Sequence, residues 1–289
     1  MIDRYQLRYF LAVVDAGNFS RAAQQVNVTQ PTLSVGIAKL EQALGARLFL
    51  RNSRRVQLTE AGVRLLAHAR AIESEFNSLE GRISGRGAGP VLRVGVLSTI
   101  PGRLVSEFVT RSRAAAPQDT LELVEGSERD LVGRLQRRRL DVALSLIRTD
   151  ETRFPTEPLY EEGYSLAAHA AHVHATAAAI PGDLLGAETM IVRRHCEALS
   201  ETSRYFTERG VRPYFAFRST NDERTVALVK AGLGVTVIPD SFAEPGLSLI
   251  KLIGFHQTRR IGLIFASPEI AARRDLPALE ALRAVRFPA

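Results

Sequence analysis

The sequence predicts two folded parts of different class: a small all-α unit at the N-terminus that leads into a long helix, and a larger α/β domain of two lobes. Three observations support this prediction. Apolar residues recur at helical spacing over the first 60 positions, a heptad repeat follows as far as residue 83, and short apolar strands alternate with helical segments from residue 91 onward. The length of 289 residues suits about two domains.

Composition excludes several classes of protein. The one cysteine, Cys196, leaves no partner for an internal disulfide, a dithiol redox switch or a cysteine-rich zinc site. No apolar run approaches the roughly 18 residues of a membrane span. Asp3, Arg8 and Asp15 interrupt the stretch where a secretion signal would be apolar. We therefore expect a soluble cytoplasmic protein that does not contact a membrane.

The net charge of +7 favours a polyanionic partner. Its distribution is more informative than its size, because the first 60 residues hold eight Lys or Arg side chains against four Asp or Glu side chains. More than half of the positive excess therefore lies in about a fifth of the chain.

Three short helices and a wing are expected in the N-terminal unit. The first helix ends at Gly17, Ser20 is placed to cap the second, a turn at 27–29 precedes the third, and Gly45 closes the third. A basic segment at 51–55 lies between alternating apolar positions, which is typical of a small two-stranded wing. The apolar faces are formed by Leu7, Phe10, Leu11 and Val14 in the first helix and by Leu33, Ile37, Leu40 and Leu44 in the third.

This order of elements fits a helix-turn-helix, in which two short helices pack together and the second presents its polar N-terminal residues to the DNA major groove. Any three-helix bundle has the same apolar spacing. Periodicity and charge therefore leave a small helical subdomain with solvated arginines as an equal alternative.

A longer string of residues separates these two readings. It resembles the N-terminal signature of LysR-type transcriptional regulators, with more than twenty positions matching in order and spacing. The matching residues are Leu7, Phe10, Gly17, Phe19, Ser20, Ala22, Ala23, Val28, Thr29, Gln30, Pro31, Leu33, Ser34, Ile37, Leu40, Glu41, Leu44, Gly45, Leu48, Phe49, Arg51, Leu58, Thr59 and Gly62.

The resemblance implies a winged helix-turn-helix that binds double-stranded operator DNA. Gln30 is the best candidate for reading adenine, and the wing arginines are expected to contact phosphates or enter the minor groove. Val35 and Gly36 depart from the polar or basic residues that the family usually has there. The expected DNA-binding residues are Ser20, Thr29, Gln30, Pro31, Thr32, Ser34, Lys39, Arg51, Arg54 and Arg55.

The heptad repeat from Leu58 to Ile83 favours a coiled coil, because a narrow seam sustained over about 25 residues suits pairing with another helix. A surface helix docked on its own domain is the alternative. In LysR-type regulators the matching segment is the linker helix that dimerises two winged domains, and the resemblance implies a dimer or tetramer. The expected dimerisation residues are Leu65, Ala69, Ile72, Phe76, Leu79 and Ile83.

A glycine-rich break at 84–90 places the domain boundary. We predict a DNA-binding domain at 1–58, a linker helix and hinge at 59–87, and an effector-binding domain at 88–289. Its lobe I is expected at 90–160 with 266–289 and its lobe II at 161–265. The alternation of strands and helices predicts a parallel sheet with helices on both faces.

The C-terminal part resembles the LysR-type effector-binding domain, which is similar to periplasmic binding proteins. Residues 140–143 and 225–239 fit its pattern, whereas Arg138 stands where the family commonly has a glycine that ends a helix. Ligands of such folds bind at the carboxyl ends of strands, and hydroxyls with arginines there suit a small organic anion. The expected effector-binding residues are Ser98, Thr99, Ser127, Arg148, Arg193, His195 and Thr220.

The sequence contains no convincing motif for cofactor binding, metal binding or catalysis. Gly232 and Gly234 lack the third glycine of a dinucleotide fingerprint, and the histidines at 169–174 have no nearby carboxylate or cysteine in the sequence, so we expect no cofactor and no metal. His195 and Cys196 are adjacent in the sequence, and adjacent side chains generally point in different directions, which argues against a catalytic pair.

We predict a regulator with no catalytic residues that binds DNA, a small effector and, as the resemblance implies, RNA polymerase. A small-molecule-binding module or an α/β enzyme with an accessory DNA-binding head is the alternative.

Overall fold

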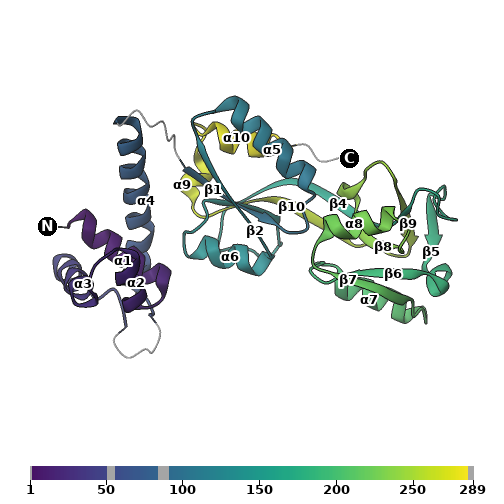
Figure 1. The fold of residues 1–289 in the computed structure, drawn as a ribbon, viewed down its shortest axis with the longest axis horizontal. Helices are drawn as coiled ribbons and strands as arrows, with labels where there is room; N and C mark the ends of the chain where they lie inside the picture. The colour runs from purple at the N-terminus through teal and green to yellow at the C-terminus, as the bar shows by residue number, and fades with distance from the viewer. Residues whose placement is uncertain (1, 51–55, 84–90, 286–289) are drawn as a thin grey trace. The chain divides into compact units, whose positions relative to one another are not determined.

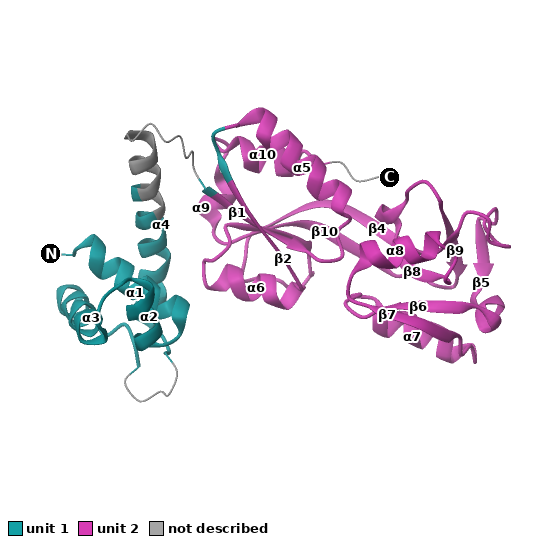
Figure 2. Cartoon of the chain, in the orientation of Figure 1, with its two compact units in different colours: residues 1–91, 118–120 teal, residues 92–117, 121–289 magenta. Residues whose placement is uncertain are grey.

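The computed structural model describes residues 2–50, 56–83 and 91–285, except for the side chains of 74, 75 and 77–83. The chain divides into two compact units, one formed by 1–91 with 118–120 and the other by 92–117 with 121–289 (Figures 1 and 2). Each unit is described by itself.

The N-terminal unit starts with the three expected helices: α1 (Arg4–Ala16), α2 (Phe19–Gln25) and α3 (Gln30–Leu44). Gly17 and Gly45 end α1 and α3 in the left-handed conformation, as predicted. The cap of α2 was predicted wrongly. Asn18 caps this helix, because its side chain accepts hydrogen bonds from the backbone N–H groups of Ser20 and Arg21, and Ser20 lies inside the first turn.

One core holds this unit together. Phe10, Leu33 and Leu40 are fully buried, and the Phe49 ring packs 5.4 Å from that of Phe10. An antiparallel bridge joins Phe49 and Leu58 at the position of the predicted wing, and residues 51–55 lie outside the described residues. The long helix α4 (Glu60–Ile83) follows.

The C-terminal unit contains an eight-stranded sheet in which β2, β1, β3, β10, β4, β9 and β5 lie side by side and β8 pairs with β4. The expectation of a parallel sheet is only partly met. β1 and β3 are parallel, but β10 runs antiparallel to both β3 and β4. The sheet is therefore mixed, and the long strand β4 (Thr156–His169) pairs with β10 through its first half and with β8 and β9 through its second half.

Lobe I surrounds the first half of this sheet (Figure 1). Its core is mostly aliphatic and includes Val94, Leu131, Leu144 and Leu279. Its elements besides the start of β4 are β1 (Val91–Leu97), α5 (Gly102–Ala115), β2 (Thr120–Gly126), α6 (Glu128–Gln136), β3 (Val142–Leu146), β10 (Thr258–Phe265), α9 (Pro268–Ala272) and α10 (Pro277–Arg283). The predicted placement of 258–265 in lobe II is wrong, because β10 pairs with β3 from Ile261 to Phe265.

Lobe II combines the second half of β4 with a separate parallel pair formed by β6 and β7. Helix α8 lies against β4 and β6, and helix α7 lies along the β6–β7 pair (Figure 1). Its elements are β5 (Ala179–Pro181), a 3₁₀ turn (Gly182–Ala187), β6 (Thr189–Arg193), α7 (Leu199–Glu208), β7 (Tyr214–Ser219), α8 (Asp222–Lys230), β8 (Thr236–Pro239), a 3₁₀ turn (Asp240–Phe242) and β9 (Leu247–Ile253).

Arg138 adopts the left-handed conformation for which this position in the family commonly has glycine. Its φ is +53°, and the N–H groups of Arg138 and Arg139 donate to the carbonyls of Leu135 and Arg134 at the end of α6. The helix therefore closes with the turn expected of a glycine, although a side chain is present.

Replacing Arg138 by glycine is expected to stabilise the domain by about 1 kcal/mol, because a left-handed non-glycine residue costs about 1–2 kcal/mol and the greater flexibility of unfolded glycine offsets part of the gain. Urea unfolding measures this change. Arg137→Gly, whose residue has a φ of −85°, is the matched control and should lose stability instead. An Arg138→Gly protein less stable than the wild type would contradict the assignment of strain.

Candidate functional site

The N-terminal end of α3 presents a row of polar side chains. Thr29, Gln30, Pro31 and Thr32 are exposed, and Ser34 is half-buried. The Thr29 hydroxyl accepts from the N–H of Thr32 and so caps the helix, and the two threonine hydroxyls lie 2.8 Å apart. The Gln30 amide nitrogen donates to the Ser34 hydroxyl at 3.1 Å. Gln30 is thereby held on the outer face of α3, while Thr29 has a structural role as well.

The two departures from the family pattern have different surroundings. Val35 is 54% exposed and continues the polar row with an apolar side chain. Gly36 is buried, and a Cβ atom there would lie 2.5 Å from the Tyr9 ring. Glycine at 36 therefore allows Tyr9 of α1 to pack closely on α3. Of the other expected DNA-binding residues, Ser20 and Lys39 are exposed, whereas Arg51, Arg54 and Arg55 lie outside the described residues.

The first half of α4 packs on its own unit. Ala69 is fully buried in the core of α1–α3, and Leu65 packs against the same core. A Cβ atom on Gly62 would lie 2.3 Å from the Leu48 carbonyl oxygen, so the helix passes close to the chain before the wing. Ala69 therefore cannot form part of a surface for a second copy, and this predicted dimerisation residue is misplaced.

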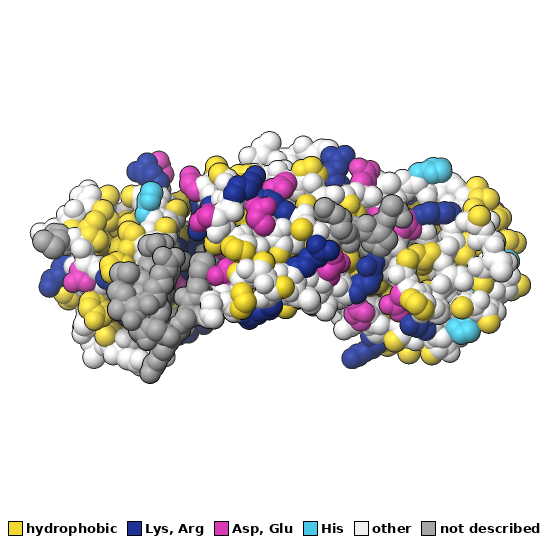
Figure 3. All heavy atoms as spheres, turned by 90° about the horizontal axis from the view of Figure 1, so that it is seen from above, with side chains coloured by type: hydrophobic (Ala, Val, Ile, Leu, Met, Phe, Trp, Pro, Cys, Tyr) yellow, Lys and Arg dark blue, Asp and Glu magenta, His cyan; other side chains and the backbone are white. Residues whose placement is uncertain are grey.

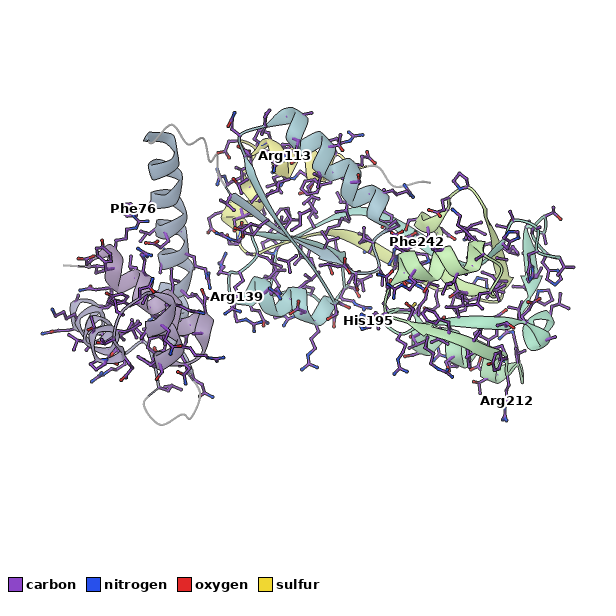
Figure 4. All side chains as sticks on the ribbon, in the orientation of Figure 1. Phe76, Arg113, Arg139, His195, Arg212 and Phe242 are labelled. Carbon is purple, nitrogen blue, oxygen red and sulfur yellow. The ribbon has the colours of Figure 1, made fainter. Side chains whose placement is uncertain are left out.

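The second half of the seam is more open. Ile72 and Phe76 are 39% and 40% exposed, and Figure 4 shows Phe76 on the side of α4 that faces the start of α1. There the Arg4 guanidinium lies 4.6 Å from the Phe76 ring centroid, and Arg4 also forms an ion pair with Glu73. The side chains of Leu79 and Ile83 lie outside the described residues.

A buried arginine joins the two lobes of the C-terminal unit. Arg259 of β10 is 4% exposed, and its guanidinium donates to the carboxylates of Glu162 on β4 and Glu197 after β6. It also donates to the hydroxyl and the carbonyl oxygen of Thr99, which follows β1. The Ser241 N–H and hydroxyl donate to Glu162 from the turn after β8. A single charged network thus holds elements of both lobes.

This network lies beside a polar cavity of about 270 Å³ at the junction of the lobes. Tyr164 donates to one oxygen of Glu197 at 2.8 Å, while the other oxygen of Glu197 and one oxygen of Glu201 are buried with no hydrogen-bond partner. Burial alone would raise the pKa of Glu197, but the Arg259 guanidinium holds it below its ordinary value of 4.5. The cavity therefore contains an ionised carboxylate with one unused acceptor.

The seven expected effector residues have different surroundings, and none of the four cavities described in the structure is lined by more than one of them. Arg148 lines the polar cavity, but its guanidinium forms a two-pronged ion pair with Glu128. Thr99 is buried under Arg259, and Ser127 caps α6 by accepting from the Asp130 N–H. The remaining four are dispersed: Ser98 lines a hollow next to Asn221, Arg193 is buried in lobe II, and His195 and Thr220 are exposed.

Arg193 forms a second buried ion pair, with Asp222 at the start of α8. One nitrogen of its guanidinium also approaches the Cys196 sulfur at 3.2 Å. Burial raises the pKa of the Cys196 thiol, although Arg193 opposes the shift. Cys196 is therefore a protonated thiol at neutral pH, not an activated nucleophile.

Sequence reasoning missed Arg259, Glu162 and Glu197, which form the centre of the junction. One signal was available for Arg259. It precedes the apolar strand run at 261–265, and alternation places it on the same side as buried Ile261. The carboxylates that neutralise it are 97 and 62 positions away along the chain, so no local pattern reveals them.

Most charges on the surface of the C-terminal unit are paired locally, and basic and acidic side chains adjoin one another on the face in Figure 3. Such pairs include Arg93 with Glu122, Arg134 with Asp130, Arg153 with Glu151 and Arg273 with Asp275. Exposed pairs of this kind contribute little stability. They do neutralise arginines that would otherwise suggest a polyanion-binding surface on this unit.

The histidines at 169–174 have a neighbour that the sequence did not suggest, because His172 lies 3.2 Å from a Glu188 carboxylate oxygen. No cluster of three or more His, Cys, Asp or Glu side chains suited to a metal ion occurs in the described parts of the chain. Within the same residues, every helix is too short or too polar to span a bilayer.

Two family models match the chain. The model described as "LysR substrate binding domain" matches residues 85–285, and that described as "Bacterial regulatory helix-turn-helix protein, lysR family" matches residues 5–63. The "DNA-binding transcriptional dual regulator OxyR" of Escherichia coli strain K12 is 31% identical over 288 residues, covering 96% of this chain and 94% of the relative. The "HTH-type transcriptional regulator XapR" of the same strain is 31% identical and covers 84% of both chains.

Solved structures share the fold. A full-length OxyR variant from Pseudomonas aeruginosa superimposes with a TM-score of 0.65 at 24% identity, covering 99% of this chain and 96% of that one. Full-length CbnR in complex with its target DNA gives a TM-score of 0.52 at 23% identity, covering 98% and 100%. Both comparisons extend over the helical unit and the α/β unit.

Glu197→Gln is expected to destabilise the protein by about 3 kcal/mol at pH 7, because it leaves the buried Arg259 with one carboxylate fewer. The pKa of Glu197 is lower in the folded state, so its contribution is present above about pH 4.5 and is lost as the pH falls through the lowered value. Urea unfolding from pH 7 to pH 3 should therefore show the two proteins converging at low pH. Exposed Glu125→Gln should change stability by less than about 0.5 kcal/mol, and a constant gap across the pH range would refute the ionised pair.

Proposed function

The chain belongs to the LysR family of bacterial transcriptional regulators, and on this premise we propose how its residues read DNA and respond to an effector. Membership makes it a DNA-binding transcription regulator with an effector-binding domain, and its relatives are regulators, not enzymes. The predicted function is confirmed at this level. The alternative of an enzyme with an accessory DNA-binding head has no support among the relatives.

We propose that α3 enters the major groove of an operator and that Gln30 reads an adenine. The exposed polar row of α3 supports this role, because a glutamine side chain can donate from its amide nitrogen to adenine N7 while its amide oxygen accepts from the N6 amino group. Gln30 stands on the outer face of the helix, where its amide can exchange the hydrogen bond to Ser34 for these contacts to the base edge. Thr32 and Ser34 extend the same surface. Phosphate contacts are assigned to Ser20, Lys39 and the wing residues Arg51, Arg54 and Arg55, which are exposed or lie outside the described residues.

We infer that α4 joins two copies through its second half. Ile72 and Phe76 are exposed residues of the heptad seam, and Leu79 and Ile83 continue their spacing. A dimer presents two copies of α3 to half-sites about one helical turn apart, or a multiple of it. Association into a tetramer, contact with RNA polymerase and a cytoplasmic location belong to the same proposal.

The cavity at the lobe junction is our candidate for the effector site. It is lined from lobe I by Arg148 and Arg260 and from lobe II by Glu197 and Glu201. The arginines already have carboxylate partners, whereas two carboxylate oxygens have none. These contacts favour an effector that brings hydrogen-bond donors over the small organic anion predicted from the sequence. A ligand that binds one arrangement of the lobes more tightly than another shifts the population toward that arrangement. This shift would change how the two copies of a dimer bind DNA.

Gln30→Ala is expected to weaken binding to the operator by about 1–3 kcal/mol while leaving binding to random DNA nearly unchanged, because it removes a base contact and no charge. Operators selected from genomic fragments serve as the specific DNA. Gln42→Ala, on the same helix and also exposed, is the matched control and should leave both affinities unchanged. Equal losses on operator and random DNA would count against base reading by Gln30.

Ile72→Glu is expected to weaken dimerisation roughly 100-fold or more, because each copy loses a buried apolar side chain and gains a charge facing its equivalent. Sedimentation equilibrium measures this change. Val63→Glu, 58% exposed on the same helix but off the seam, is the matched control and should leave the dimer intact. A dimer equally stable in both variants would place the interface elsewhere.

A further inference from the structure

Lobe II contains a second cavity, of about 500 Å³, that shares no lining residue with the polar cavity. It lies between α7 and the parallel pair of β6 and β7. Its floor includes Met190, Val192 and Phe215 of the two strands, and α7 supplies Leu199, Ser203 and Phe206. Cavities of this size with mostly apolar walls are typical of small-molecule sites.

A β-bulge in β7 places the Arg218 side chain on the face of the strand that lines this cavity. Met190 pairs with Phe215, but the next pair is Ile191 with Phe217, so β7 contains one extra residue. The extra residue reverses the alternation of β7 and brings Phe215 and Arg218 to the same face, toward α7. Ile191 and Phe217 face the opposite way and pack with α8 residues.

The charges around the cavity are all basic, since its lining contains no carboxylate. Arg193 is already neutralised by Asp222. The Arg218 guanidinium lies 5.5 Å from the Phe215 ring centroid, which holds it beside the cavity floor, and no carboxylate partners it in the described structure. Arg212 lies at the other end, and Figure 4 shows its side chain directed away from α7 and β7.

Three threonine hydroxyls in the walls are satisfied internally. The hydroxyls of Thr202 and Thr207 donate to carbonyls one turn earlier in α7, and the Thr236 hydroxyl donates to the Ile191 carbonyl. The walls therefore offer a bound molecule mainly apolar contact along α7, whose ten residues span about 15 Å.

We propose that this cavity is a binding site for an amphipathic carboxylic acid. The elongated apolar body lies between α7 and the β6–β7 pair, and the carboxylate accepts hydrogen bonds from Arg218. Arginine suits this role because its planar fork matches the two oxygens of a carboxylate. The site is separate from the cavity at the lobe junction, and its test does not depend on DNA binding.

The test uses the full chain and three probes with the same tail: decanoate, decanol and decylammonium. The protein contains no tryptophan, so Phe215→Trp introduces a single tryptophan into the cavity wall, which can be excited selectively over the tyrosines. Decanoate is expected to shift its emission to the blue and to saturate below its micelle concentration. Calorimetry on the unsubstituted chain gives the same affinity without the reporter. The other two probes should bind at least tenfold more weakly, because neither carries an anionic head.

Two substitutions locate the site. Arg218→Gln should weaken decanoate binding about tenfold or more, whereas Arg212→Gln at the far end is the matched control and should change it less than threefold. Ser203→Phe, at an exposed position of α7, fills the cavity from one side and should abolish binding without unfolding the core. Absence of decanoate binding, equal binding of the three probes, or undiminished binding after Ser203→Phe would overturn the proposal. A larger loss with Arg212→Gln than with Arg218→Gln would overturn the assignment of the carboxylate.

Discussion

The structure of the effector domain depends on a buried positive charge. Arg259 sits almost out of solvent where β10 crosses β4, and removing a guanidinium from water costs several kcal/mol unless hydrogen bonds and opposite charges replace the lost hydration. Glu162, Glu197 and Thr99 supply that replacement from three separate parts of the chain. The arginine therefore specifies how the strand ends and loops of both lobes meet, because few other arrangements satisfy all of its donors.

The segment 196–199 transmits this constraint to both cavities. Glu197 is bound to Arg259 and faces the polar cavity at the lobe junction, while Cys196 and Leu199 line the apolar cavity of lobe II. A ligand in either cavity thus contacts a segment whose position is set by the same ion pair. Coupling between two sites requires such a shared element with more than one arrangement.

The helical unit has its own constraint, which is the rigid attachment of α4. Helix α4 is attached to the unit that carries α3 by three features: the close backbone approach at Gly62, the burial of Ala69 and the ion pair of Arg4 with Glu73. In a dimer formed through the second half of α4, the direction of that helix would therefore determine where each recognition helix points. The heptad repeat does not distinguish packing on the helical unit from pairing with a second copy of α4. The sequence pattern of an apolar seam is the same whether the seam faces its own core or another helix.

Local interactions determined what the sequence could predict by itself. Helices α1 and α3 end at the glycines that the sequence predicted, and the signature of the first 62 residues predicted the helix-turn-helix family, because caps, periodicity and motifs involve residues a few positions apart. Only the tertiary structure decided that Asn18 and not Ser20 caps α2, that Ala69 faces inward, that β10 belongs to lobe I, and that Arg148 and Arg193 are committed to Glu128 and Asp222. These outcomes depend on which of several suitable partners a side chain or strand meets in the folded chain. Since burial and charge pairing join residues as distant as Glu162 and Arg259, the linear pattern of the sequence does not contain them.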